Sequence, residues 1–185
     1  MACMQYIAFD FETSGLPQGK RNVEVTEETV KSYDTCRAVS LSAARFSHRG
    51  RLLDTFDAII TPTDFTISQQ SIDVHGITQE RAKREGKPFT EVFLDFVKFI
   101  GSRTKTMVAH NASFDVGVLR SEMIRNGINL KLLNDLVFRC TLQLYRERFL
   151  KPIRLGVLYN EIFGEDFENA HVERCILTSS DTHGP

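Results

Sequence analysis

Two carboxylates near the N-terminus, Asp10 and Glu12, are separated by one residue and follow an apolar run. Alternate side chains of a β-strand point to the same face, so this spacing puts both carboxylates on one face and Phe11 on the other. Like charges held this close repel each other, and a hard divalent cation would remove the repulsion, since magnesium and manganese prefer carboxylate oxygens. A solvated strand end beside the turn expected at Ser14-Gly15 is the competing interpretation. This stretch alone leaves both open.

A third acidic residue, Asp115, follows a short apolar strand expected over residues 106–109. Asn111 or Ser113 is expected to cap the next helix, with Asp115 in its first turn. A carboxylate there interacts favourably with the helix dipole, which is the purely structural explanation. Ligands of α/β sheets collect where strands end and helices begin. If the two strands are neighbours, Asp115 therefore faces the first acidic pair across one crevice.

A histidine, His171, lies at the expected start of the last helix, which begins near residues 168–169. A lone histidine is usually a surface or packing residue. A histidine at a helix start near carboxylates can instead act as a general base on water.

The order of the expected elements indicates one α/β domain over residues 1–185. An alternating pattern in the first part of the chain predicts an antiparallel meander, and helical spacing dominates afterwards. Such an order indicates a mixed sheet covered by helices. The expected strands after the N-terminal one cover 37–46, 52–60 and 106–109, and the expected helices cover 90–100 (capped by Thr90), 113–126, 141–149 and 153–163. Residues 17–35 are polar and form an excursion, either a binding loop or an ordinary insertion.

Composition narrows the class of protein. The chain has 185 residues, of which 42% are hydrophobic, and a formal net charge of -1. A polyanionic partner must therefore be bound by local basic patches or through metal ions. The 4 cysteines form no CxxC pair or short Cys/His spacing, so neither a zinc site nor a disulfide framework is expected. No stretch approaches a membrane-spanning length, which favours an intracellular protein, cytoplasmic or nuclear, without a membrane partner.

Several segments together resemble, in order, the motifs of the DnaQ-like (DEDDh) three-prime-to-five-prime exonucleases. The matching segments are Phe9–Pro17 (first motif), Val74–Thr78 (hydrophobic-His-Gly-Ile-Thr), His110–Asp115 (His-Asn-Ala-x-Phe-Asp) and Asn169–His171 (start of the third motif). The resemblance extends from Tyr6 to about Leu177. It implies an RNase H-like fold, a five-stranded mixed sheet flanked by helices, and a nuclease that releases nucleoside monophosphates from three-prime ends.

The resemblance also implies a two-metal site. Asp10 would bridge two Mg²⁺ or Mn²⁺ ions, Glu12 would complete the first site, Asp115 would support the second, and His171 would deprotonate the attacking water. Such ions generate hydroxide near neutral pH and stabilise charge on phosphate oxygens. They would also supply the positive field that the net charge lacks.

The substrate side of this expected site combines backbone donors with aromatic side chains. Contact with the terminal nucleotides is expected from Phe11, Thr13, Ser14, Gly15, His75, Asn111 and Phe114. His75 has an equal alternative as a core histidine that caps a turn.

A basic run over residues 146–154 interleaves with Tyr145 and Phe149. Basic runs are usually solvated faces. This mixture also suits Arg146 and Arg148 for binding a single-stranded backbone, with the rings stacking on bases. The motifs look most like those of proofreading subunits and repair exonucleases. The expected partners are therefore single-stranded three-prime ends, with DNA favoured over RNA, and a DNA polymerase.

The third motif departs from the family pattern His-x-Ala-x-x-Asp. Glu173 stands at the small-residue position and Ile176 at the metal-binding Asp position. Three hypotheses remain open. Glu173, one turn before Ile176, could replace the lost ligand; the site could work in weakened form, needing more metal or preferring manganese; or the domain could be an inactive module that binds nucleic-acid ends.

Overall fold

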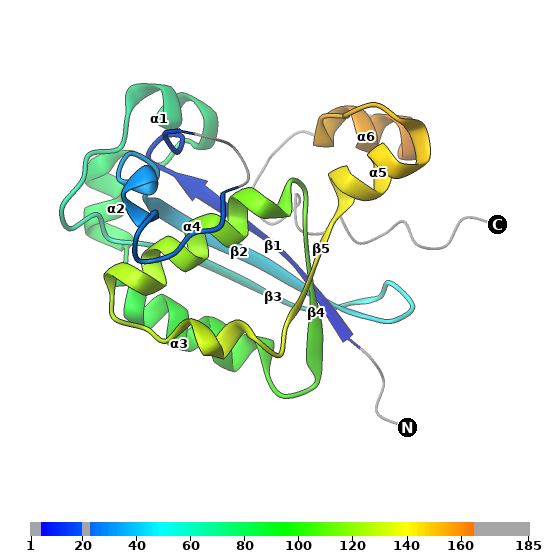
Figure 1. Cartoon of the computed structure of the whole chain (residues 1–185), viewed down its shortest axis with the longest axis horizontal. Helices are drawn as coiled ribbons and strands as arrows, with labels where there is room; N and C mark the ends of the chain where they lie inside the picture. The colour runs from blue at the N-terminus through cyan, green and yellow to red at the C-terminus, as the bar shows by residue number, and fades with distance from the viewer. Residues whose placement is uncertain (1–4, 20–22, 165–185) are drawn as a thin grey trace.

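A five-stranded mixed sheet in the order β3-β2-β1-β4-β5 forms the centre of the protein (Figure 1). The computed structural model describes residues 5–19 and 23–164. The strands are β1 (Gln5–Thr13), β2 (Ala38–Ser47), β3 (Leu52–Ile59), β4 (Thr104–Ala109) and β5 (Val137–Cys140). The first three pair antiparallel, whereas β4 pairs parallel with both β1 and β5. The predicted meander and mixed sheet are thereby confirmed.

Helices connect and cover these strands. In chain order they are the 3-10 helix η1 (Val30–Tyr33), α1 (Gln69–His75), α2 (Gln79–Glu85), α3 (Phe89–Ile100), α4 (Ala112–Arg125), the 3-10 helix η2 (Leu130–Leu133), α5 (Thr141–Phe149) and α6 (Leu155–Phe163). None of those helices, which belong to the described part of the chain, is both long and apolar enough to cross a membrane.

Helix α3 begins one residue earlier than the sequence predicted. Its N-cap is Pro88 and its first residue is Phe89, so the prediction that Thr90 caps this helix is wrong. Phe89 is buried in the core. Its burial draws the first turn of the helix against the sheet, and Thr90 lies within that turn.

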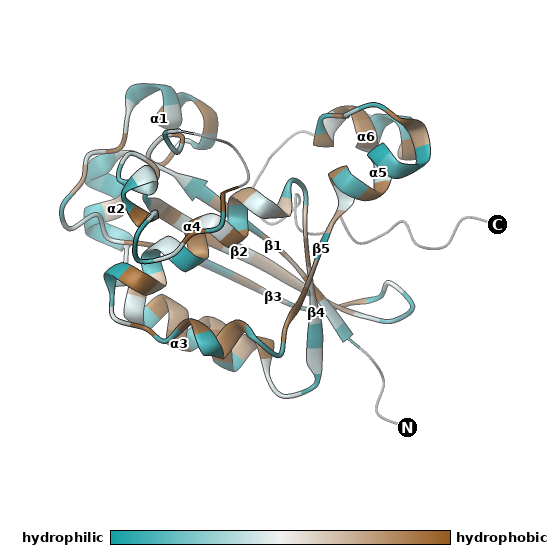
Figure 2. Ribbon diagram, in the orientation of Figure 1, coloured by the Kyte–Doolittle hydropathy of each residue, from teal (hydrophilic) through white to brown (hydrophobic). Residues whose placement is uncertain are grey.

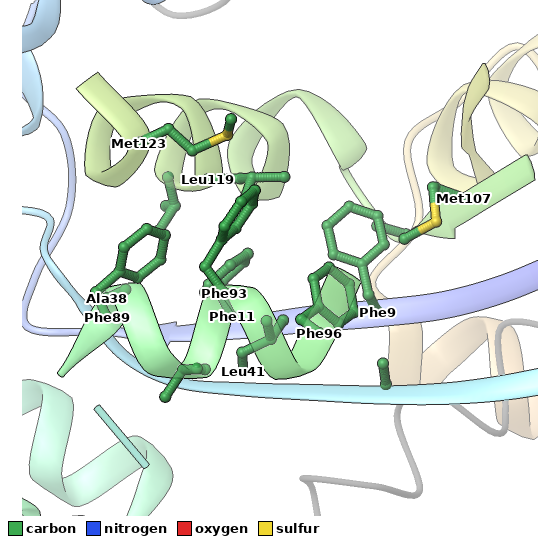
Figure 3. Close-up of a cluster of buried hydrophobic side chains, with 14 of the residues drawn as sticks. Phe9, Phe11, Ala38, Leu41, Phe89, Phe93, Phe96, Met107, Leu119 and Met123 are labelled. Atoms are coloured by element: carbon green, nitrogen blue, oxygen red, sulfur yellow. The ribbon is translucent and has the colours of Figure 1, made fainter. Parts of the chain in front are cut away.

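Strand β1 separates two apolar layers. Phe9 and Phe11 belong to the main core with residues of α3 and α4, whereas Ala8 packs on the opposite face with Ala44 and Phe46. Figure 3 shows the aromatic side chains of α3 lying near Phe9 and Phe11, with Leu119 and Met123 of α4 on the other side of the cluster. Hydrophobic residues accordingly concentrate along the central strands and α3 in Figure 2.

The polar excursion is tied to helix α4. Arg120 donates a hydrogen bond from Nε to the Val25 carbonyl (2.9 Å), and its guanidinium also pairs with Glu24. Arg125 donates to the Asp34 carboxylate (2.8 Å), and Tyr33 is buried in the main core. The described part of this segment is therefore an integral insertion whose apolar residues extend the core.

Helix α4 has a glycine where the excursion crosses it. A Cβ atom on Gly117 would lie 2.1 Å from Tyr33 Oη and 2.6 Å from Cζ. We expect Gly117→Ala to lower the free energy of unfolding by about 1–3 kcal/mol through overpacking, partly offset by the better helix propensity of alanine. Urea unfolding would measure this loss, and the same substitution in a Tyr33→Leu background should cost much less. An equal cost in both backgrounds would place the strain elsewhere.

Candidate active site

Strands β1 and β4 separate near the acidic residues. Their parallel pairing ends at Ala8 and Val108, and β1 continues beyond it. Past that point, the Phe11 N–H donates to Asp115 Oδ1 at 3.0 Å, across 104 residues of sequence. The carboxylate at the start of α4 thus takes the place that a neighbouring strand would have. In α/β sheets, ligands usually bind where two neighbouring strands separate at their carboxyl ends.

The first acidic pair lies on the face of β1 away from the main core. Asp10 is opposite Ser42 and Glu12 is opposite Ser40 in the antiparallel register with β2. Their neighbour Phe11 is in the main core, as the alternation predicted. Glu12 is buried and Asp10 is half-buried.

The three carboxylates influence one another electrostatically. Burial raises the pKa of Asp115 well above its ordinary value, and the negative charge of Asp10 adds to this effect. The hydrogen bond from the Phe11 N–H opposes the increase, and Glu12 raises the pKa further. Burial and neighbouring negative charges thus both disfavour the charged form of this carboxylate, and a bound cation would favour it.

The chemistry of these donors fits a divalent cation. Carboxylate oxygens are preferred ligands of Mg²⁺ and Mn²⁺, and the pKa of Asp115 is raised first by burial and then by the negative charge of Asp10. Among residues 5–19 and 23–164, however, no three His, Cys, Asp or Glu side chains are grouped so as to hold a metal ion. The described carboxylates therefore have oxygen ligands suited to a divalent cation, but they are not already arranged as a metal site.

The segment after Glu12 is fixed by its contacts with the start of β2. The Ser14 N–H donates to the Arg37 carbonyl (2.9 Å), and the Arg37 N–H donates to Ser14 Oγ (3.0 Å). Thr13 Oγ1 donates to the Gly15 carbonyl. A Cβ atom on Gly15 would lie 2.6 Å from the Thr35 carbonyl oxygen. Gly15 is thus required by the close approach of two backbone segments, whatever it contributes to a nucleotide.

A buried ion pair, absent from the sequence-based candidates, joins α4 to this segment. Arg37 donates from Nε to Glu122 Oε1 (2.7 Å), and Glu122 Oε1 also accepts from the Ala38 N–H (3.1 Å). Arg37 Nη2 donates to Glu122 Oε2 (3.2 Å), and Nη1 donates to Asp64 Oδ1 (2.8 Å). Burial alone would lower the pKa of Arg37, but the hydrogen bonds and charges of Glu122 and Asp64 outweigh it and raise the pKa. Glu122 lies about two turns beyond Asp115 on the same side of α4, and this spacing is the only sequence signal for it.

Three other sequence candidates lie at or next to helix ends, namely His75, Asn111 and Phe114. His75 is buried at the end of α1, where its Nδ1 accepts from the Ile77 N–H (3.0 Å). This contact matches the turn-capping alternative, and a nucleotide contact for His75 stays a prediction. Asn111 is the N-cap residue of α4, as one of two expected alternatives, but it adopts φ 66° and its side chain makes no capping hydrogen bond. Asparagine tolerates that left-handed conformation better than most residues. Phe114 is half-buried against the main core.

His110 connects the end of β4 to the helices that follow the sheet. Its Nδ1 and Nε2 hydrogen-bond with Thr141 Oγ1 (2.9 Å) and the Ile153 carbonyl (3.1 Å). Burial lowers the pKa of His110, and the contact with the Ile153 carbonyl only partly opposes this. A neutral ring that donates to Ile153 and accepts from Thr141 satisfies both bonds.

We expect acid to weaken this connection. Because the folded pKa of His110 is depressed, its contribution to stability is present above the unfolded value of about 6.5 and is lost as pH falls through the folded pKa. A His110→Asn variant should therefore lose less stability than the wild type between pH 7 and pH 5, by urea unfolding. Equal losses in the two proteins would show that His110 does not carry this pH dependence.

The basic run lies on α5, whose helical prediction is confirmed, and extends into the segment after it. Arg146 and Arg148 are exposed, and the Arg148 guanidinium lies 5.3 Å from the Phe149 ring centre. Tyr145 is buried, and its hydroxyl donates to Glu161 of α6 (2.8 Å). Tyr145 is therefore unsuited to the base stacking expected of it, whereas Phe149 is half exposed. His171, Glu173 and Ile176 lie outside the described residues, so the predictions for them stay predictions.

Known proteins similar to this chain agree with the fold and define its family. The model of the exonuclease family RNase_T matches residues 7–163. A PolC-type DNA polymerase III of Pediococcus pentosaceus is 30% identical over 178 residues, which cover 96% of this chain and 11% of the polymerase. The corresponding polymerase of Lactococcus lactis is 28% identical over 88% of this chain and 9% of its own length.

Among solved structures, a zinc-bound complex of E. coli exonuclease I with single-stranded DNA has a TM-score of 0.73 at 18% identity. That similarity covers 96% of this chain and 40% of exonuclease I. The chain belongs to the exonuclease family, and its resemblance to the DnaQ-like three-prime-to-five-prime exonucleases is confirmed. It spans about a tenth of the length of these polymerase relatives.

Proposed function

We propose that this domain is a metal-dependent exonuclease that hydrolyses the terminal phosphodiester bond at the three-prime end of single-stranded or frayed DNA. The observation that carries the proposal is the position of Asp115. Its buried carboxylate accepts a hydrogen bond from β1, and the charges of Asp10 and Glu12 raise its pKa. More than 100 residues of sequence separate Asp115 from these two residues. A bound cation would relieve the repulsion among these acidic groups.

Asp10, Glu12 and Asp115 would hold two Mg²⁺ or Mn²⁺ ions, and Glu173 is a further candidate ligand. When bound, such ions lower the pKa of water and stabilise charge on phosphate oxygens. Asp115 would then be held in its charged form, with the Phe11 N–H fixing one of its oxygens. His171 would accept the proton of the attacking water.

DNA is the proposed substrate because proteins similar to this chain act on or bind DNA. The polymerase relatives are DNA polymerases, and exonuclease I is known in a complex with single-stranded DNA. Thr13, Ser14 and Gly15 follow Glu12 directly and would face the terminal nucleotide, and the exposed Arg146 and Arg148 of α5 would hold the backbone further along. A DNA polymerase is the proposed protein partner.

A three-prime-labelled oligonucleotide incubated with magnesium or manganese tests this proposal. Release of mononucleotide by the wild type, and none by an Asp10→Ala control, is the expected result. Absence of release in both metals, with end binding intact, would contradict hydrolysis.

A second candidate, an inactive module that binds nucleic-acid ends, is favoured by Ile176 at the position of the fourth metal carboxylate. Two variants separate a weakened site from a replaced ligand. If the missing carboxylate limits activity, Ile176→Asp should raise release in magnesium. If Glu173 replaces it, Glu173→Ala should abolish release while Ile176→Asp changes little.

A further inference from the structure

A row of polar side chains crosses the sheet from β1 to β3. Asp10 of β1 pairs with Ser42 of β2, and Ser42 in turn pairs with Asp57 of β3. Directly paired residues of antiparallel strands point to the same face of the sheet, with Cβ atoms about 4.5–5.5 Å apart. The Ser42 side chain therefore lies between two carboxylates.

The packing around this row shows which face of the sheet it occupies. Ala8 and Ala44 belong to the small apolar cluster on the face opposite the main core. Asp10 and Ser42 are the next residues along their strands that point to that face. The residues on either side of Ser42 in the sequence belong to the main core, and Ser42 itself is 3% exposed. The Ser42 hydroxyl is thus buried on the same side of the sheet as Asp10.

The hydroxyl of Ser42 is oriented toward β3. Its Oγ donates to Asp57 Oδ1 at 2.5 Å, within the range of charge-assisted O–H···O⁻ hydrogen bonds. A serine hydroxyl has one proton and two acceptor lone pairs. With its proton directed at Asp57, Ser42 Oγ can act toward Asp10 only as an acceptor. An ionised Asp10 is also only an acceptor, so a cation with its bound water would suit both oxygens.

We propose that Ser42 is a positioning residue for cation binding at Asp10. Its oxygen accepts a hydrogen bond from a water molecule in the hydration shell of the ion, and Asp57 holds the hydroxyl in the orientation that this bond requires. The inference rests on the proposed metal-dependent function. Magnesium suits the arrangement because it gives up its waters reluctantly and usually keeps several of them in protein sites.

A purely structural role for this row would be a hydrogen bond that joins β2 to β3. A neutral acceptor would join the strands equally well, whereas Asp57 adds a third negative charge to the face that carries Asp10 and Glu12. That charge is unfavourable for the sheet alone and favourable once a cation is bound. The two roles also differ in what they affect, because a structural bond changes stability and leaves the affinity for cations unchanged.

Manganese binding by the full chain, without nucleic acid, tests the proposal separately from hydrolysis. Free Mn²⁺ is measured by electron paramagnetic resonance during a titration. Ser42→Ala removes the acceptor and should raise the Kd for manganese by about 10–100-fold, as the loss of partners beyond the direct metal ligands typically does. Asp57→Ala should change the Kd in the same direction, because the Ser42 hydroxyl can then turn its proton to Asp10. Asp57 is exposed, so this second variant leaves the buried core unchanged.

Asp54→Ala is the matched control. It removes another exposed carboxylate of β3, but one that pairs with Arg45 at 3.4 Å. Arg45 lies over the Phe99 ring of the main core, so Asp54 belongs to the other face of the sheet and its loss should leave the manganese Kd unchanged. Urea unfolding establishes that each variant is folded under the titration conditions.

The outcomes separate this inference from the proposed function. The inference is overturned if Ser42→Ala binds manganese as tightly as the wild type, or if Asp57→Ala and Asp54→Ala have the same effect. A wild type that binds no manganese would overturn the inference together with the metal-dependent function. Manganese binding that depends on Ser42, in a wild type that releases no mononucleotide, would support the inference and contradict hydrolysis alone.

Discussion

Replacing Asp115 by asparagine should reduce the proposed exonuclease activity by about 10³-fold, because the proposed metal site would supply several kcal/mol of transition-state stabilisation. The same change should leave the fold intact. The amide oxygen of the substituted side chain can still accept the hydrogen bond from the Phe11 N–H, which the carboxylate accepts at 3.0 Å. Mononucleotide release under saturating metal measures the first effect, and urea unfolding measures the second.

The substitution should also remove part of the pH dependence of stability. Burial and the charge of Asp10 raise the folded pKa of Asp115 above its unfolded value, which is about 3.9 for an aspartate. The folded protein therefore holds this proton more tightly, so the stabilising contribution is complete below about pH 3.9 and is lost as pH rises through the folded pKa. In the absence of metal, the wild type should lose more stability than Asp115→Asn as pH rises from about 3.9 through the folded pKa of Asp115.

Magnesium and a surface variant provide the controls. Bound cations favour the charged carboxylate, so magnesium should shrink the difference in pH dependence between the two proteins. Asp73→Asn removes the charge of an exposed residue of α1 and should behave like the wild type. If the pH profiles of Asp115→Asn and the wild type coincide without metal, the carboxylates are not coupled as the structure implies.

Local rules were enough to predict where the acidic residues of the candidate site lie in the fold. The alternation of a strand places Asp10 and Glu12 on one face, and a helix start after a buried strand places Asp115 at the sheet end. Helices α1 and α2 were missed because each has only seven residues, with few apolar positions to define a period. Their caps, Ser68 and Thr78, were the available signals.

Long-range contacts could not be predicted in the same way. Arg37 and Glu122 are separated by 85 residues, and neither lies in a pattern that names its partner. Likewise, the polarity of residues 17–35 indicated a surface segment, whereas the buried Tyr33 fills space left by Gly117. Pairings of this kind depend on how whole elements pack, which the sequence around each residue does not specify.

The Arg37–Glu122 pair provides the largest expected effect on stability. Arg37→Met removes the guanidinium that pairs with Glu122. The Glu122 carboxylate is 2% exposed, and of these contacts it would keep only the hydrogen bond from the Ala38 N–H. Leaving one charge of a buried pair without its partner typically costs about 3–5 kcal/mol. We expect a loss of that size in urea unfolding. Lys98→Met, which breaks an exposed pair with Asp95, should leave the unfolding midpoint nearly unchanged.

A double variant separates the lost pair from the lost packing. Arg37→Met with Glu122→Leu replaces both charges by apolar side chains, and such replacements are often neutral or stabilising. It should therefore be more stable than Arg37→Met alone. A double variant as unstable as the sum of both single variants would show that packing around Arg37, and not the unpaired Glu122, sets the cost.

The same pair should also matter for catalysis, because it spans the candidate active site. The Arg37 backbone holds Ser14 beside the first acidic pair, while its side chain holds Glu122 on the helix that carries Asp115. The double variant keeps the fold but lacks this polar connection, so α4 can shift relative to β1. We expect it to need a higher magnesium concentration for half-maximal release than the wild type does, although both are fully folded. An unchanged magnesium requirement would limit the pair to stabilising the fold.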